Sequence, residues 1–150
     1  MGYCQVSERA AGNWLYLKMS PIANMLIQIK NAQAVNAESV SIPFSKLKFE
    51  IGKILKEKGF IESIEKKKKK MKKAEVEYLE VKLRFNDGAG AISGLRFVSK
   101  PSRRIYAGKE DLKSVRSGYG ISVVSTAKGI ITGEDARKAG VGGEVLFEMW

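Results

Sequence analysis

The chain has 150 residues, 44% of them hydrophobic, which suits one ordinary domain or two small ones and excludes a disordered composition. Its formal net charge of +11 favours a polyanionic partner, nucleic acid first and an anionic membrane surface second. With one cysteine and no histidine, the sequence excludes an internal disulfide and the usual Cys/His zinc site, and it lacks the commonest acid–base side chain.

The folded part is expected to begin near Met19, with residues 1–18 as a loose extension, because those residues show no clear hydrophobic period. Ser20 and Pro21 form a helix-start signal, a hydroxyl cap followed by proline at the first helical position. Lys30 and Asn31 lie near the end of this predicted helix. The apolar residues that share its buried face are Ile22, Met25, Leu26 and Ile29.

A short strand is predicted over residues 40–42, followed by a second helix that opens at Phe44 and Ser45. Ser45 can cap this helix, and Phe44 can pack on Phe49 as a hydrophobic staple. Gly59 ends it, where a positive φ costs glycine little. The predicted buried stripe consists of Leu47, Ile51, Ile54 and Leu55.

Two further strands are predicted over residues 60–65 and 76–85, the second from strict alternation of apolar and charged residues. Between them, Lys66 to Lys73 contains seven lysines interrupted only by Met71, and we expect this run at a hairpin tip. It is either a solvated, self-repelling loop or a site of phosphate contact without sequence choice. Since the run supplies seven of the charges, the net charge alone is weaker evidence for nucleic acid.

Residues 86–90 form a turn cluster and the best internal boundary. An N-terminal α/β domain over residues 19–87 and a C-terminal β-rich domain over residues 88–150 are therefore predicted, an α+β fold overall. In the second domain, the sequence predicts strands at 92–98, 121–124, 130–131 and 144–149, and short helices at 109–116 and, after a capping box at Thr132, up to Ala139.

The connection Ser125–Gly129 carries two hydroxyls and a lysine without bulk, groups that can bond phosphate oxygens, ribose hydroxyls and base edges. It can equally be a plain hairpin whose Ser125 and Thr126 bond their own turn backbone. Gly142 and Gly143 lack the spacing of a phosphate-binding glycine loop and serve either a bulge or a close approach of backbone.

Glu144 repels phosphates, so on an RNA surface it should accept from a base amino group or hold Lys128 or a serine in place. On a solvent-facing strand it is simply an edge charge. Arg103, Arg104 and Tyr106 form a plausible backbone-contact patch with one stacking surface.

Four segments occur in order and together closely resemble the family of bacterial small-subunit ribosomal protein eight, from about Met19 to Trp150. These are S-P-I-A-N-M-L-I-Q-I-K-N-A, K-P-S-R-R-I-Y, S-T-A-K-G and G-V-G-G-E. The resemblance implies a monomer in the cytoplasmic ribosome that binds the rRNA central domain early in assembly, next to small-subunit proteins five and twelve. It implies no catalytic residue, cofactor or metal.

The resemblance also implies which residues meet rRNA. The main surface is Ser125, Thr126, Ala127, Lys128, Gly129, Gly142, Gly143 and Glu144. Secondary contacts are Ser20, Pro21, Lys30, Asn31, Arg103, Arg104 and Tyr106. The chain departs from the family where Ala127 replaces a usual serine and Ser20 a usual aspartate, and in its lysine run and first 18 residues, to which no family role is carried over.

The sequence disfavours two other classes of function. An enzyme acting on nucleotides is disfavoured because the sequence lacks histidine, metal-ligand spacing and a phosphate-binding loop. Binding to a membrane surface through the lysine run is disfavoured because no amphipathic helix with large aromatics adjoins it, and no apolar run approaches the roughly 18 residues of a membrane span.

Overall fold

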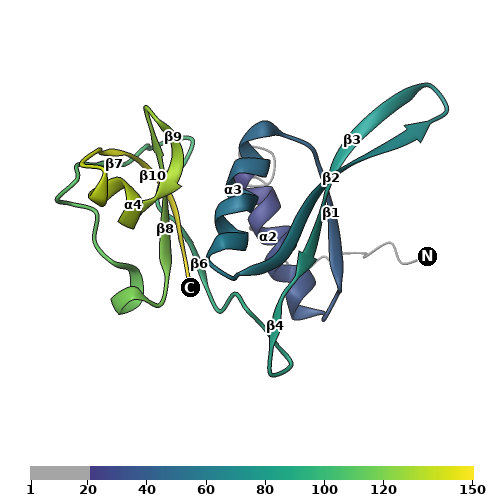
Figure 1. The fold of residues 1–150 in the computed structure, drawn as a ribbon, viewed down its shortest axis with the longest axis horizontal. Helices are drawn as coiled ribbons and strands as arrows, with labels where there is room; N and C mark the ends of the chain where they lie inside the picture. The colour runs from purple at the N-terminus through teal and green to yellow at the C-terminus, as the bar shows by residue number, and fades with distance from the viewer. Residues whose placement is uncertain (1–20) are drawn as a thin grey trace.

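The computed structural model describes residues 21–150, which form the predicted α+β fold (Figure 1). The predictions made for residues 1–18 and for Ser20 lie outside the described residues. The first elements are α2 (Pro21–Ala34), β1 (Ser39–Pro43), α3 (Lys46–Glu57), β2 (Ile61–Met71) and β3 (Ala74–Leu83). They are followed by β4 (Phe85–Asn86), β5 (Ala89–Gly90), β6 (Leu95–Phe97), β7 (Tyr106–Ala107), η2 (Val115–Gly118), β8 (Ile121–Thr126), β9 (Gly129–Thr132), α4 (Gly133–Lys138) and β10 (Gly143–Met149).

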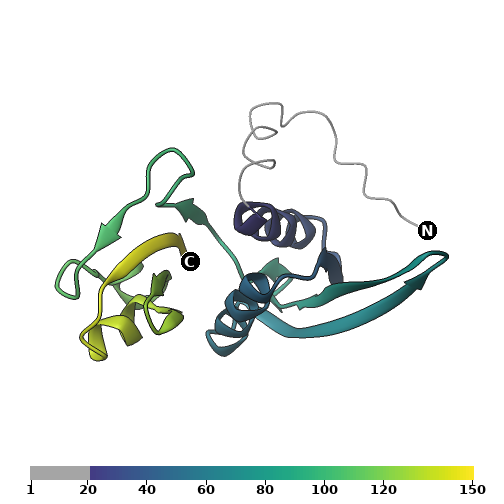
Figure 2. The same ribbon diagram turned by 90° about the horizontal axis from the view of Figure 1, so that it is seen from above.

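The N-terminal region, residues 21–83, is an antiparallel sheet of order β1-β3-β2 packed against α2 and α3. Helix α3 lies between this sheet and the C-terminal region, residues 91–150 (Figure 1, Figure 2). The predicted apolar positions of α2 and β3 fill the core, since their spacing places them on one face of each element. The fully buried ones are Met25, Leu26, Ile29, Leu79 and Val81.

Most of the local signals for α3 are confirmed. Ser45 stands at the N-cap, although its side chain makes no capping hydrogen bond. The rings of Phe44 and Phe49 lie 6.5 Å apart, as a staple requires, and Gly59 has a φ of +81° at the helix end. Leu47 was wrongly assigned to the buried stripe: it lies in the first turn of α3 and is 39% exposed, whereas the buried side chains of that turn and the next are Lys48 and Ile51.

The lysine run lies at the end of a hairpin, as predicted, but most of it is strand and not loop. Strand β2 continues through Lys66–Lys70 to Met71, and only Lys72 and Lys73 make the turn into β3. The run is a strand because β3 offers it a partner along its whole length, with Lys68 opposite Glu77 and Lys70 opposite Glu75. The ion pairs of Lys66 and Lys68 with Glu77 stabilise the inner part of this ladder, so that part of the run is not a self-repelling loop.

The C-terminal region is a second antiparallel sheet of order β6-β10-β8-β9, and β7 also pairs with β10. Helix α4 begins at the predicted cap, where the Thr132 hydroxyl accepts a hydrogen bond from the amide of Asp135 at 3.2 Å. The register of β10 against β8 shifts at a β-bulge between Val145 and Phe147, so Val145 packs toward α4 and Phe147 toward the N-terminal helices.

The helix predicted over residues 109–116 is not formed. The segment is irregular and ends in the 3₁₀ turn η2, in which Arg116 and Ser117 have positive φ values of 48° and 55°. Leu112 and Val115 are its two buried apolar residues, and two anchors three residues apart do not require an α-helix. The Arg116 guanidinium lies over the Trp150 ring, with its Cζ 4.5 Å from the ring centroid.

Three sets of contacts join the regions. Lys58 at the end of α3 lies 3.6 Å from the Glu134 carboxylate in α4, and the main buried cluster contains residues of both regions. The buried Gln33 side chain accepts from the Ile92 amide at 3.2 Å and donates to the carbonyls of Phe60 and Arg84. The division into domains at residues 87 and 88 stays a prediction.

Candidate nucleic-acid interface

Three candidate residues from separate parts of the chain meet in one row across the C-terminal sheet. Glu144 of β10 is the register partner of Tyr106 in β7 on one side and of Ser125 in β8 on the other. Because paired residues of antiparallel strands project from the same face, the three side chains share one face of the sheet. We call Tyr106, Glu144 and Ser125 the cross-strand row.

The row continues the face of the sheet that is buried further along. Val123 and Phe147 are register partners on this face and are fully buried in the main core. Beyond them the face opens: the side chain of Glu144 is 13% exposed and Tyr106 is 70% exposed. The core therefore fixes the strands that carry the row, while the row itself can reach a ligand.

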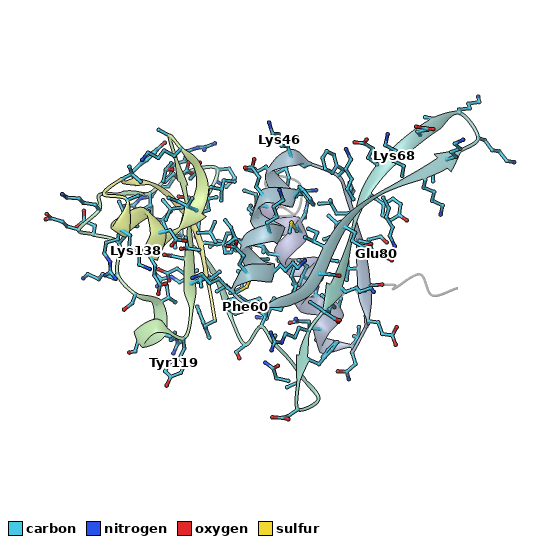
Figure 3. All side chains as sticks on the ribbon, in the orientation of Figure 1. Lys46, Phe60, Lys68, Glu80, Tyr119 and Lys138 are labelled. Atoms are coloured by element: carbon cyan, nitrogen blue, oxygen red, sulfur yellow. The ribbon has the colours of Figure 1, made fainter. Side chains whose placement is uncertain are left out.

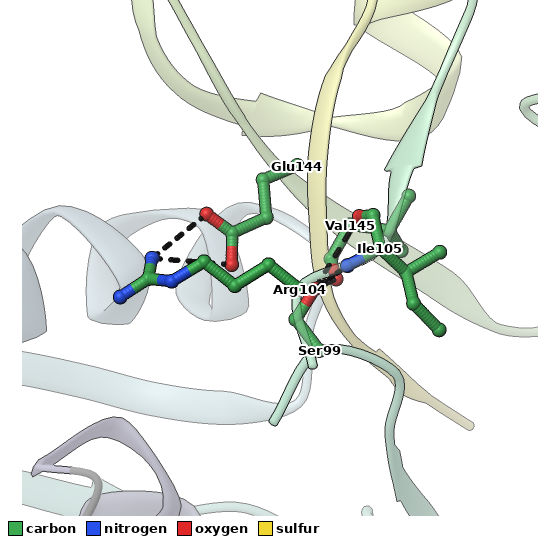
Figure 4. A network of polar contacts seen from close by, with 5 residues as sticks. All are labelled: Ser99, Arg104, Ile105, Glu144 and Val145. Atoms are coloured by element: carbon green, nitrogen blue, oxygen red, sulfur yellow. Dashed lines mark hydrogen bonds and ion pairs between the residues drawn. The ribbon is translucent and has the colours of Figure 1, made fainter. Parts of the chain in front are cut away.

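An ion pair compensates the one carboxylate of the row. Arg104 Nη1 lies 3.1 Å from Glu144 Oε2 and 3.4 Å from Oε1 (Figure 4). Of the alternatives for Glu144, holding Lys128 or a serine is not what the structure shows, since the acid is held by Arg104; acceptance from a base amino group stays a prediction. Pairing leaves little net charge at the centre of the row, which lowers the repulsion that a bare carboxylate would exert on a phosphate.

Ser99, which the sequence reading missed, positions the segment that supplies Arg104. Its hydroxyl donates to the Val145 carbonyl at 2.6 Å and accepts from the Ile105 amide at 3.0 Å (Figure 4). Between these residues, Lys100 and Arg103 exchange two backbone hydrogen bonds around a Pro101-Ser102 turn. A serine directly before a Lys-Pro-Ser-Arg turn was the available signal, because serine hydroxyls commonly bond turn backbone.

The connection predicted over Ser125–Gly129 is a tight β8–β9 hairpin with Ala127 and Lys128 exposed at its turn. Thr126 Oγ1 donates to the Gly129 carbonyl at 2.9 Å and accepts from the Lys128 amide at 3.2 Å. Thr126 thus follows the plain-hairpin alternative. Ser125 does not: within residues 21–150 its half-buried hydroxyl has no hydrogen-bond partner.

Gly142 and Gly143 provide a close approach of backbones inside the protein. A Cβ on Gly143 would lie 2.2 Å from the Ser125 carbonyl oxygen, and one on Gly142 would lie 2.6 Å from that of Ala107. Neither glycine has a positive φ, so the requirement comes from space alone. These glycines let β10 sit between β7 and β8 and so assemble the cross-strand row.

The remaining candidates are not drawn into the row. Pro21, Lys30 and Asn31 are exposed on α2, in the N-terminal region. Arg103 is exposed in its turn, and Gly129 has a φ of +116° with open space around it. Among the described residues, no hydrogen bond or ion pair ties these side chains to Glu144 or Ser125.

Neither a metal-binding cluster nor a membrane-spanning helix is found in the described part of the chain. Residues 21–150 contain no group of three or more His, Cys, Asp or Glu side chains that could hold a metal ion. Over the same residues, no helix has both the length and the apolar character needed to cross a membrane.

The chain is similar to known proteins over nearly all of the described range. The family model for ribosomal protein S8 matches residues 20–150. Small ribosomal subunit protein uS8 of Persephonella marina is 47% identical over 133 residues, which cover 87% of this chain and 97% of that protein. The protein of the same name from Acidithiobacillus ferrooxidans is 45% identical over 130 residues, covering 84% and 93%.

Another protein of that name, from Caldicellulosiruptor bescii, is 47% identical over 133 residues, which cover 88% of this chain and 98% of that protein. The similarity spans both sheets, including every residue of the cross-strand row. The chain therefore belongs to the ribosomal protein S8 family, a family of structural ribosomal components that are not enzymes.

Proposed function

We propose that the chain binds small-subunit rRNA directly, in the central domain, as a structural constituent that supports assembly of the subunit. The observation that carries this proposal is the cross-strand row, with its exposed ring at Tyr106 and an unpartnered hydroxyl at Ser125. Family membership supports the ribosome as the setting.

The row offers the groups that a folded RNA helix can be recognised by. Tyr106 can stack on an unpaired base, and the Ser125 hydroxyl can bond a ribose 2′-hydroxyl or a base edge. Glu144, already paired with Arg104, keeps carboxylate lone pairs that can accept from a base amino group. Lys128 at the adjacent turn contributes a phosphate contact.

The secondary contacts are part of the same proposal. Pro21, Lys30 and Asn31 on α2, and Arg103 beside the row, would meet the rRNA backbone, and Ser20 is included on the resemblance alone. Gly142, Gly143, Ala127 and Gly129 act by allowing the RNA and the strands to approach closely. None of these contacts requires a cofactor.

Small-subunit proteins five and twelve are proposed as neighbours in the assembled cytoplasmic ribosome, where the chain is a monomer. Cross-linking within intact subunits tests this. Links from surface lysines of this chain to both proteins are expected, and links to neither would remove them as partners.

Footprinting on intact small-subunit rRNA tests the main proposal. Wild-type protein should protect a helix of the central domain, and replacing Ser125–Lys128 by a glycine-rich turn should abolish that protection. Circular dichroism of the replaced protein serves as the folding control. Unchanged protection by a folded variant would disprove direct binding through this surface.

A further inference from the structure

The β2–β3 hairpin projects from the N-terminal sheet as an arm, defined here as residues 66–77. Strand β1 pairs with β3 only from Tyr78 to Lys82, and beyond the contacts of Phe44 with Lys66 and Glu77 no third strand of the described residues joins the hairpin. The arm extends away from the C-terminal region (Figure 1, Figure 2). It is therefore a separate surface from the cross-strand row.

The inner lysines of the arm are held by glutamates. Lys66 Nζ lies 3.0 Å from Glu77 Oε2, Lys68 Nζ lies 3.7 Å from Glu77 Oε1, and Lys67 bonds Glu80. Lys68 and Glu80 are labelled on the hairpin in Figure 3. The hydrogen bond to Glu80 raises the pKa of Lys67, and the hydrogen bond from Lys66 lowers the pKa of Glu77. These three lysines already have carboxylate partners.

The outer lysines have none. Lys69, Lys70, Lys72 and Lys73 are all exposed, and within residues 21–150 no carboxylate lies within ion-pair distance of them. Glu75 is the register partner of Lys70 but forms no ion pair with it. The uncompensated positive charge of the arm is thus concentrated at its tip.

We propose that this tip binds the phosphate backbone of RNA at a second place, apart from the cross-strand row. The inference rests on the proposed function and deepens it. A lysine ammonium is a point charge without the planar fork that arginine offers to a base edge, and the arm contains no arginine. The contact is therefore made to phosphate oxygens and carries no sequence choice.

The shape of the tip suits phosphates that approach from different directions. Successive residues of a strand point to opposite faces, so Lys69 and Lys70 project on opposite sides of the ribbon. Lys72 and Lys73 extend from the turn beyond them. Such a tip can enter between two backbone segments of a folded RNA and meet both.

Other occupants fit this arm less well. Its exposed apolar side chains are Met71 and Val76, far less than the apolar face that anchors a helix at a membrane surface. Addition of a strand from another protein is opposed by lysines along β2, since charged edge strands resist such pairing. Phosphate backbone matches both the charge and the lack of cover.

Two RNA contacts on one chain have a thermodynamic consequence. Once the cross-strand row has bound, the tip searches for phosphates at the high local concentration set by the folded chain between them. The protein then holds two RNA segments at a fixed separation.

The test replaces Lys69, Lys70, Lys72 and Lys73 together by glutamine and measures affinity for intact small-subunit rRNA as a function of salt. Each phosphate contact contributes roughly 0.7–0.9 to the slope of log affinity against log salt, so the slope should fall by about 3. Hydroxyl-radical footprinting should show loss of one protected segment while the central-domain helix stays protected. The inner ion pairs are untouched, so thermal unfolding should match wild type.

A matched variant removes the same charge elsewhere, at the exposed Lys46, Lys56, Lys82 and Lys113. This variant should retain both protected RNA segments, and its slope of log affinity against log salt should fall by less than that of the tip variant. If the tip variant keeps the wild-type salt slope and both footprints, the inference is wrong. It is also wrong if the variant keeps both and loses only cross-links to a neighbouring protein. If wild type itself fails to bind the rRNA, the proposed function fails instead.

Discussion

The cross-strand row and the arm tip are two polar surfaces with opposite organisation. In the row, Glu144 is paired with Arg104 and fixed between β7 and β8 by register. At the tip, four lysines have no carboxylate partner among the described residues and no third strand beside them. RNA binding through the row should fall when a single hydrogen-bonding group is removed. RNA binding through the tip should depend only on the number of positive charges there.

The largest effect is expected where the row is assembled. Gly143→Ala places a methyl 2.2 Å from the Ser125 carbonyl oxygen, so β8 and β10 must separate. We expect a loss of about 3 kcal/mol in the free energy of unfolding, measured by urea denaturation, together with loss of RNA binding. The arm should be unaffected.

Gly140→Asn is the control for this change. Gly140 has a φ of +69° and no neighbour within 4 Å of an added Cβ, and asparagine tolerates this conformation. Its stability should remain within about 0.5 kcal/mol of wild type. Equal losses in both variants would mean that close packing of β8 and β10 is not what Gly143 provides.

The next largest effect is expected on RNA binding, with little change in the stability of the protein. Glu144→Ala should weaken binding to the central-domain RNA about tenfold, because one charged hydrogen bond is worth about 1.5 kcal/mol. The salt slope should not change. Stability should fall by less than about 1 kcal/mol, since the released Arg104 is 63% exposed.

Glu148→Ala is the matched control, since Glu148 also lies on β10 beside an arginine, Arg96, but pairs with Ser122 on the opposite face. It should bind RNA as wild type does. A common loss in both variants would show that β10 acts through its overall charge and not through the face that carries the row.

A smaller effect is expected at the turn beside the row. Thr126→Val removes the oxygen that bonds both the Gly129 carbonyl and the Lys128 amide, whereas Thr126→Ser retains it. We expect about fivefold weaker RNA binding for valine, from about 1 kcal/mol of lost turn order, and little change for serine. Equal binding by both variants would argue against an ordered turn as the requirement.

The smallest effect is a pH dependence confined to the inner arm. Because Lys66 lowers the pKa of Glu77, the stabilising contribution is present above the ordinary glutamate value of 4.5 and is lost as pH falls through the lowered value. Because Glu80 raises the pKa of Lys67, that contribution is complete below 10.5 and is lost as pH rises through the raised value.

NMR titration of the β2 amides measures the acid transition directly. Its midpoint should lie below 4.5, Glu77→Gln should remove it, and Glu75→Gln should leave it in place. A transition that survives Glu77→Gln would contradict the role assigned to this ion pair.

Local sequence signals were sufficient for most of the fold. Proline at Pro21, the Phe44–Phe49 staple and the cap at Thr132 act within a few residues, so they can be recognised without knowing the rest of the structure. The strand predicted from the apolar alternation of β3 is also confirmed, because its face toward the helices holds buried side chains such as Leu79.

The failures occurred where the deciding partner is distant or the pattern is uniform. A run of lysines has no hydrophobic period, so the strand over Lys66–Lys70 is visible only with β3 beside it. The segment 109–116 has two buried residues, Leu112 and Val115, which an irregular chain buries equally well.

The site was predicted in parts and not as a unit. Ser125, Tyr106 and Glu144 were each candidates, largely through the family resemblance, but their alignment depends on register between β7, β10 and β8. The Arg104–Glu144 pair joins residues 40 positions apart, and no local spacing indicates it. Ser99 was missed for the same reason, since it acts through the backbone of Val145.

The lysine-bearing strand also governs how copies of this chain meet one another. Among residues 21–150 no strand pairs with the outer edge of β2, and an open edge is a template for pairing with an identical molecule. Here such pairing would bring two rows of ammonium groups face to face. Newly made molecules should therefore remain dispersed at low ionic strength and begin to self-associate only when salt or a polyanion screens the edge.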